Sequence, residues 1–219
     1  MNMETVVNSS LTAVELVVAT LMFASGLPRR RAFALRGTIA CAALAVVIGT
    51  FMSRIASSSS AHLAGLIVLY AMALVFCCAT VGFCCEATTW TALFCATAGY
   101  TTQNLASGII GFVNQVGGLF PPGLALYAMT SLVEFELAYA AIYLVMVRRM
   151  NRDGLVVEED HGMLFMVLVV IFAVIGLDVC IKSSYVAGIE FATFVTLRLV
   201  HALVCAFVLF AEYQMLYKT

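Results

Sequence analysis

The chain has 219 residues, of which 63% are hydrophobic and only 11% are charged, and its mean hydropathy is +1.07. A soluble domain averages about 25% charged residues, so this composition could not cover a soluble surface of this size, and lipid must be the solvent for much of the exterior. The net charge of -1 gives no indication of a nucleic-acid partner.

Apolar segments follow one another along the chain, each close to the ~20 residues that a membrane-spanning helix needs. We expect spans at residues 10–27, 33–52, 62–83, 91–113, 124–147, 163–181 and 186–209, with the last helix running on through Thr219. Because lipid offers no hydrogen-bond partners, each segment must satisfy its own backbone groups as a helix. The predicted fold is therefore all-α, a polytopic membrane bundle of about seven transmembrane helices.

Lys and Arg residues near the span ends predict the orientation, because they accumulate in cytoplasmic loops. With seven spans, eight of these residues lie on one side and two on the other. The eight are Arg29, Arg30, Arg31, Arg36, Arg148, Arg149, Arg152 and Lys218, and the two are Arg54 and Lys182. The N-terminus is therefore expected outside and the C-terminus in the cytoplasm. The first span carries its positive charges after the apolar run, which favours an uncleaved span over a signal peptide.

Ionisable side chains within the spans cost at least about 2.5–3.5 kcal/mol each at the membrane centre, so we expect them to face the bundle interior or a cavity. In the last span, Glu190, Arg198 and His201 fall on one face at about 100° per residue. Arg198 is expected to pair with a carboxylate on another helix. The candidates are Glu134, Glu136 and Asp178.

The two carboxylates of the fifth span, Glu134 and Glu136, are about 200° apart around the helix and cannot face the same neighbour. A polar stripe that starts at Tyr127 ends at Glu134, which is therefore expected to point inward. Glu136 is expected to meet a different helix or a dimer partner.

The fourth span carries a stripe of small and polar residues at steps of four: Cys95, Gly99, Gln103 and Ser107. Small residues let membrane helices approach closely, and an amide can hydrogen-bond across the interface. Such groups either set the packing or line a polar cavity. The candidate ligand-binding or polar-core set is Gln103, Asn104, Glu134, Asp178, Glu190, Arg198 and His201.

The chain offers little for catalysis. Most of its eight cysteines lie in apolar segments and are expected to be buried hydrophobes. Neither a metal-spaced cluster nor a nucleotide-binding loop occurs, so no metal or cofactor is predicted. His201 and Cys205 are one helical turn apart, which leaves a membrane-embedded cysteine peptidase as an alternative.

The fourth span is the most distinctive segment, and it reads Trp90-Thr-Ala-Leu-Phe-Cys-Ala-Thr-Ala-Gly99-Tyr100-Thr-Thr-Gln103-Asn104-Leu-Ala-Ser-Gly108. It resembles a block in the membrane sensor regions of GHKL-type bacterial histidine kinases, the group that includes the AgrC-like quorum receptors. The end of the chain, residues 210–218, is similar to the start of the signalling helix of those proteins. The phosphoacceptor His and the ATPase boxes of the family are absent from the sequence.

The resemblance implies a sensor bundle at residues 1–209 and the start of a cytoplasmic signalling helix at 210–219, in a homodimer in the bacterial cytoplasmic membrane. A peptide or small-molecule ligand would shift the helix packing, with the outer loop 114–123 as its entrance. This chain itself would not be an enzyme. The alternative, from another class, is the substrate-binding membrane subunit of a small-molecule or vitamin transporter, and the DNA downstream of codon 219 would discriminate between the two.

Overall fold

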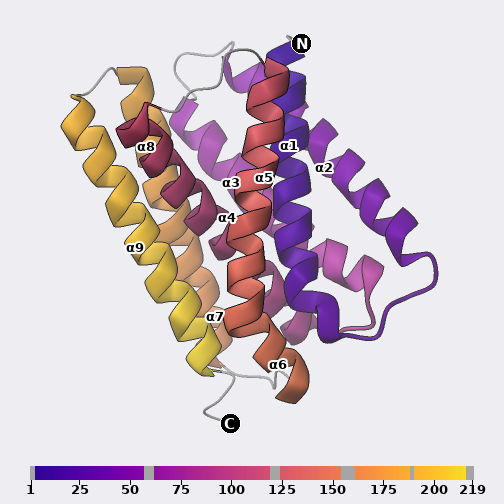
Figure 1. The fold of residues 1–219 in the computed structure, drawn as a ribbon. Helices are drawn as coiled ribbons and strands as arrows, with labels where there is room; N and C mark the ends of the chain where they lie inside the picture. Colours follow the sequence, from indigo (N-terminus) through magenta and orange to yellow (C-terminus); the bar gives the residue numbers. More distant parts are fainter. Residues whose placement is uncertain (1–2, 57–61, 119–123, 154–160, 188–189, 216–219) are drawn as a thin grey trace.

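The computed structural model describes residues 3–56, 62–118, 124–153, 161–187 and 190–215, and within them every regular element is a helix (Figure 1). The elements are α1 (Met3–Phe23), η1 (Ala24–Gly26), α2 (Phe33–Ala56), α3 (His62–Cys84), α4 (Thr89–Gly117), α5 (Leu124–Ile142), η2 (Tyr143–Val147), α6 (Arg148–Asp153), α7 (His161–Val169), η3 (Val170–Ile175), α8 (Gly176–Ala187) and α9 (Phe191–Met215). The expectation of an all-α fold is confirmed for this part of the chain.

Five helices in the described residues are long and apolar enough to cross a membrane. They are Val6–Gly26, Phe33–Met52, Ala64–Cys84, Ala128–Asn151 and Phe191–Met215. The segment Phe165–Ile181 is a shorter apolar helix. Large apolar side chains such as Val133, Leu137 and Val145 are exposed along the outside of the bundle. A multi-pass membrane protein is therefore plausible from the helices themselves.

The helix α4 lies at the centre of the bundle and packs against α1, α3, α5 and α9. Residues 94–102 of α4 are all buried, which covers every face of more than two turns. Because other helices surround this part of α4, it can contain buried polar residues such as Thr97 and Thr101. The same polarity explains why α4 does not stand among the five helices that are long and apolar enough to cross a membrane.

The ends of α4 follow from its sequence. Thr88 is the N-cap, and its hydroxyl accepts a hydrogen bond from the backbone N–H of Thr91 at 3.2 Å. Gly118 terminates the helix in the left-handed conformation, with φ 63°, and its N–H donates to the carbonyl of Asn114. The helix therefore ends at the two glycines 117 and 118.

Figure 1 shows α1 beginning at one end of the bundle and α9 ending at the other. The second end carries a group of arginines that we call the arginine-rich end: Arg29, Arg30, Arg31, Arg36, Arg148 and Arg149. Three segments join there. The backbone N–H of Arg30 donates to Cys84 O at 3.0 Å, and Asn151 Nδ2 donates to Ser25 Oγ at 2.8 Å.

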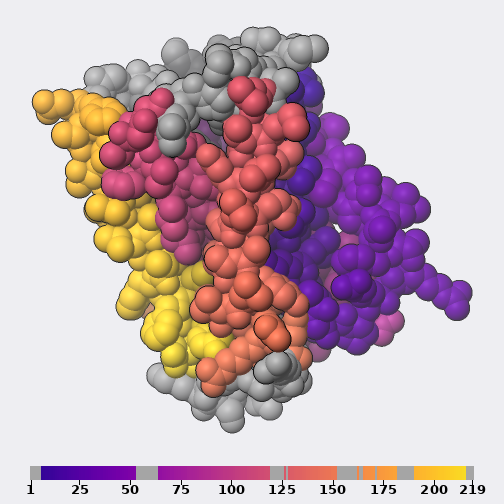
Figure 2. Space-filling view, viewed as in Figure 1, coloured from indigo at the N-terminus to yellow at the C-terminus, as the bar shows by residue number. Residues whose placement is uncertain are grey.

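The space-filling view shows α5 running along the front of the molecule, with α9 on one side and α1 and α2 on the other (Figure 2). The helix α5 continues through η2 into α6 without a break, and α7 continues through η3 into α8 in the same way. Both η2 and η3 are π-helical, so each inserts extra backbone into an otherwise regular helix.

The predicted boundary before the last span is wrong. The last span was expected to begin at Val186, but residues 186 and 187 belong to α8, and α9 begins at Phe191. The pattern misplaced this boundary because the polar stretch Lys182-Ser183-Ser184 lies inside α8, whereas only Gly188, Ile189 and Glu190 separate the two helices. The expected helical continuation to Thr219 is seen as far as Met215, and residues 216–219 lie outside the described part.

Candidate functional site

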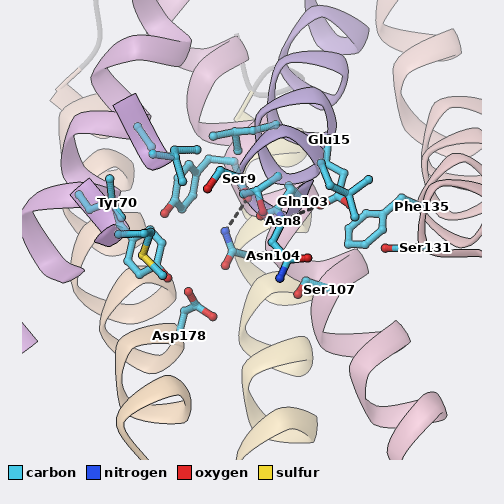
Figure 3. A pocket seen from close by; sticks show the side chains of 18 residues that line it. Asn8, Ser9, Glu15, Tyr70, Gln103, Asn104, Ser107, Ser131, Phe135 and Asp178 are labelled. Atoms are coloured by element: carbon cyan, nitrogen blue, oxygen red, sulfur yellow. Dashed lines mark hydrogen bonds between the residues drawn. The ribbon is translucent and has the colours of Figure 1, made fainter. Parts of the chain in front are cut away.

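A cavity of about 450 Å³ lies between six helices, in the half of the bundle where α1 begins and away from the arginine-rich end. Figure 3 shows the side chains that line it. Its walls come from α1, α2, α3, α4, α5 and α8. The lining residues are Asn8, Ser9, Leu11, Thr12, Glu15, Leu16, Ile48, Met52, Leu69, Tyr70, Ala73, Tyr100, Gln103, Asn104, Ser107, Ser131, Phe135 and Asp178. More than half of these side chains are polar, which is unusual for the interior of an apolar bundle.

The contact between α1 and α4 positions Glu15. A Cβ atom on Gly99 would lie 2.5 Å from Thr20 Cα, so the two backbones touch at this point. One turn further along α4, Gln103 Nε2 donates to Glu15 Oε2 at 3.4 Å. The predicted roles of Gly99 in close approach and of the Gln103 amide in bridging two helices are both confirmed.

A second helix holds the backbone of Glu15 in place. The hydroxyl of Tyr139 on α5 donates to the Glu15 carbonyl oxygen at 3.1 Å. Tyr139 and Phe135 pack edge to face, with ring centroids 5.9 Å apart, and Phe135 itself lines the cavity. Glu15 is therefore fixed from both α4 and α5, and its side chain is only 5% exposed.

Asn104 and Asp178 reach the cavity from different helices. Asn104 is 4% exposed, and its Nδ2 donates to the carbonyl of Tyr100 one turn earlier in α4 at 2.9 Å. Asp178 is 7% exposed and lies in the first turn of α8, directly after the π-helical segment η3. One extra residue in a helix rotates everything beyond it by about 100°. The π-helix therefore sets which face of α8, and with it Asp178, meets the cavity.

Of the seven predicted site residues, the structure brings three together at this cavity: Gln103, Asn104 and Asp178. Glu134 lies elsewhere, half-buried, and accepts a hydrogen bond from Asn114 Nδ2 at 3.2 Å. Glu136 is exposed, so of the two neighbouring carboxylates Glu134 is the inward one, as the polar stripe predicts.

The three residues predicted on the last span do not line the cavity. Glu190 is exposed and precedes α9, where its carbonyl accepts the Phe194 N–H at 3.1 Å, so its expected place on a helix face with Arg198 is wrong. The Arg198 guanidinium lies 5.4 Å above the Phe194 ring and against Gly111 of α4. His201 is 1% exposed. The pairing of Arg198 with a carboxylate stays a prediction.

The main omission from the predicted set is Glu15, and with it the polar face of the first helix. Asn8, Thr12 and Glu15 follow the i, i+4, i+7 spacing of one helix face, and all three line the cavity. That spacing could have identified them from the sequence. Tyr70 carries no comparable signal, because no other polar residue shares its face at helical spacing in the largely apolar α3.

Comparison of the chain with protein-family models, with curated proteins and with solved structures gives no match. The geometry of the cavity and of the helices around it therefore carries the functional inference.

Proposed function

We propose that this chain is the ligand-sensing transmembrane domain of a two-component sensor histidine kinase of the GHKL, AgrC-like type, and that the cavity is its ligand site. The observation that carries the proposal is the polar cavity of about 450 Å³ inside an apolar bundle. Pockets for small molecules typically measure about 300–1,000 Å³ and combine apolar walls with a few convergent polar groups.

A packed connection from the cavity to the last helix supports a sensing role. The central helix α4 lines the cavity with Gln103 and Asn104 on one side and packs extensively against α9 on another. A Cβ atom on Gly108 of α4 would lie 3.2 Å from Ala202 Cβ of α9, so the two helices have little freedom to move independently. A ligand that shifts α4 would therefore shift α9 as well.

The proposed topology has seven spans: α1, α2, α3, α4, the rod α5–η2–α6, the rod α7–η3–α8, and α9. The bias of Lys and Arg assigns the arginine-rich end to the cytoplasm and the cavity to the outer half of the membrane. A ligand would then enter from outside, and α9 would pass the change inward. The proposal includes a homodimer in the bacterial cytoplasmic membrane, with the kinase region following this chain.

The burial of α9 near its end suits this role. Glu212 is 1% exposed, and Val208 and Leu209 are buried beside it. The α9 helix thus remains packed in the bundle beyond residue 209, where the signalling segment is proposed to begin. A shift of the bundle would be transmitted directly into that segment.

The test starts from the DNA beyond codon 219, where the proposal expects a dimerisation helix and an ATPase domain. Autophosphorylation of the full-length product in nanodiscs is then compared for wild type, Gln103→Ala and Arg198→Ala, with Val133→Ala as a lipid-facing control. Altered activity in the first two variants but not in the control is expected. Unchanged activity in both would count against a signalling connection through these residues.

The second candidate, a substrate-binding transport subunit, is favoured by the same cavity. A stop codon directly after residue 219, next to a gene for a transport ATPase, would support it. The peptidase alternative has less support, because His201 and Cys205 are 1% and 0% exposed and neither lines the cavity.

A further inference from the structure

The charged residues among the described lining of the cavity are all acidic. Glu15 approaches from α1 and Asp178 from α8, and the described lining residues include no Lys, Arg or His. Figure 3 shows the two carboxylates on opposite sides of the space, with Gln103 and Asn104 between them. The arginines of the arginine-rich end lie at the other end of the bundle and do not line the cavity.

The described residues that line the cavity bring no cation to Glu15. Glu15 is 5% exposed, and its carboxylate accepts a hydrogen bond from the neutral amide of Gln103 over a long 3.4 Å. Removing an ionised carboxylate from water costs several kcal/mol unless a cation and good hydrogen bonds compensate. A cationic ligand would therefore stabilise the ionised carboxylate of Glu15, whereas an anion would not.

Aromatic rings in the cavity wall are the second feature that favours an organic cation. Phe135 lies beside Glu15, and Tyr70 lies on the side of the cavity near Asp178 (Figure 3). The face of an aromatic ring attracts an organic cation within about 6 Å, most strongly in a desolvated site. The same rings, with Leu16, Ile48 and Leu69, offer apolar surface to the rest of a ligand.

We propose that the cavity binds an organic cation, an ammonium group on an apolar or aromatic body, with Glu15 as its main counter-ion and Asp178 as the second. This inference shares one premise with the proposed function, namely that the cavity binds a ligand. A bare metal ion fits poorly. The volume is far larger than an ion needs, and the described residues hold no group of three side chains suited to ligate one.

Three probes of matched size and different charge test this inference on the whole chain in nanodiscs: 2-phenylethylamine, 2-phenylethanol and phenylacetate. At pH 7 the first is a cation, the second neutral and the third an anion. Binding is measured as the rise in melting temperature with probe concentration. We expect the amine to stabilise the protein in a saturable manner, and the alcohol and the acid to have no comparable effect.

Variants then locate the charge. Glu15→Gln and Asp178→Asn should each weaken amine binding, the former by about tenfold or more, whereas Glu15→Asp should retain most of it. Glu136→Gln is the matched control, because it makes the same chemical change at an exposed carboxylate outside the cavity. If Glu15→Gln does not fold, Asp178→Asn and the comparison of the three probes on wild type still test whether the cavity prefers a cation.

Equal stabilisation by all three probes would overturn the cation preference and leave the cavity as a ligand site. The cation preference would also be overturned if the amine did not stabilise the wild-type protein. Equal amine binding by wild type, Glu15→Gln and Asp178→Asn would overturn it as well. The proposed sensing role fails by a different result, namely unaltered autophosphorylation of the full-length Gln103→Ala and Arg198→Ala proteins.

Discussion

Gly99 and Thr20 are in backbone contact: a Cβ atom on Gly99 would lie 2.5 Å from Thr20 Cα and 2.7 Å from Thr20 N. Both partner atoms belong to the main chain of α1, so they cannot move aside as the end of a flexible side chain would. This contact fixes the separation of α1 and α4. Because Glu15 and Gln103 sit one turn away on the same two helices, it also fixes the wall of the cavity.

Gly99→Ala should therefore destabilise the protein. An added methyl group forces α1 and α4 apart, and overpacking of this kind costs about 1–3 kcal/mol or more. Thermal unfolding in detergent micelles measures the effect as a lower melting temperature. Gly82→Ala is the control, because a Cβ atom at Gly82 meets no atom within 4 Å and alanine favours the helix. Equal melting temperatures of the two variants would contradict the close contact.

Tyr139→Phe should lower stability by about 1 kcal/mol, the usual value of one buried hydrogen bond. The substitution removes the hydroxyl that donates to the Glu15 carbonyl and leaves the ring packed against Phe135. The matched control is Tyr143→Phe, since Tyr143 is 37% exposed. Thermal unfolding of the two variants in parallel is the measurement, and a larger loss in the control would refute the assignment.

The sequence predicted the elements of this fold better than the residues of its site. Predicted starts at Phe33, His62 and Leu124 coincide with the observed helix starts, because polar or Gly/Pro-rich stretches precede each of them. The boundary between α8 and α9 was misplaced because the polar stretch 182–184, which resembles a loop, lies inside α8. The π-helices η2 and η3 were not predicted either, since an extra residue in a helix leaves the mean hydropathy unchanged.

Residues of the central helix were the most predictable part of the site. Gln103 and Asn104 stand out because they are amides in a membrane-length helix, and both line the cavity. Glu134 has the same kind of sequence signal and instead contacts Asn114 outside the cavity. The polarity of a residue shows that it turns inward, but which helices surround it depends on packing that a single sequence does not encode locally.

Arg36→Ala should destabilise the arginine-rich end. Arg36 Nη1 donates to the carbonyl of Phe83 at 2.7 Å, and its guanidinium lies 5.0 Å from the centre of the Phe83 ring. That carbonyl belongs to the last turn of α3, where no further helical N–H is available. Because Arg36 is only half-buried and its hydrogen bond to Phe83 is exposed, we expect a loss of only about 1 kcal/mol, below the range for buried charged hydrogen bonds.

The control for Arg36 is Arg31→Ala, which removes the same charge from an exposed position at the same end. Hydrogen exchange of the last turn of α3, together with the melting temperature, separates the two variants. Faster exchange in Arg36→Ala alone is expected. Identical behaviour of both variants would mean that only net charge matters at this end.

Fusions of reporters to the chain test the proposed seven spans. Green fluorescent protein fused after Thr219 should fluoresce in bacteria, and alkaline phosphatase at the same position should be inactive, because the last span is expected to end in the cytoplasm. Fusions after Gly118, behind α4, should show the reverse, and fusions after Ala87, behind α3, should match Thr219. The opposite pattern at Gly118 would require a different number of spans.

The reactivity of Cys85 tests how the arginine-rich end is packed. Cys85 is 0% exposed and follows the last residue of α3. Burial raises the pKa of the Cys85 thiol above its ordinary value, and this effect outweighs the opposing charge of two neighbouring arginines. The thiolate is the reactive form, so a raised pKa leaves less of it at neutral pH. Alkylation of Cys85 by N-ethylmaleimide should therefore be slow and should reach its maximum only at a higher pH than for an exposed thiol.

A neighbouring exposed position provides the comparison for Cys85. Glu86 is exposed, so Glu86→Cys in a Cys85→Ser background places a thiol one residue away in solvent. Site-resolved mass spectrometry between pH 7 and 10 gives both rates. Below its pKa each thiol should react about tenfold faster per pH unit, with the Cys85 profile displaced to higher pH. Coincident profiles would show that Cys85 is open to solvent, and the joining of residues 28–30 to the end of α3 would then be wrong.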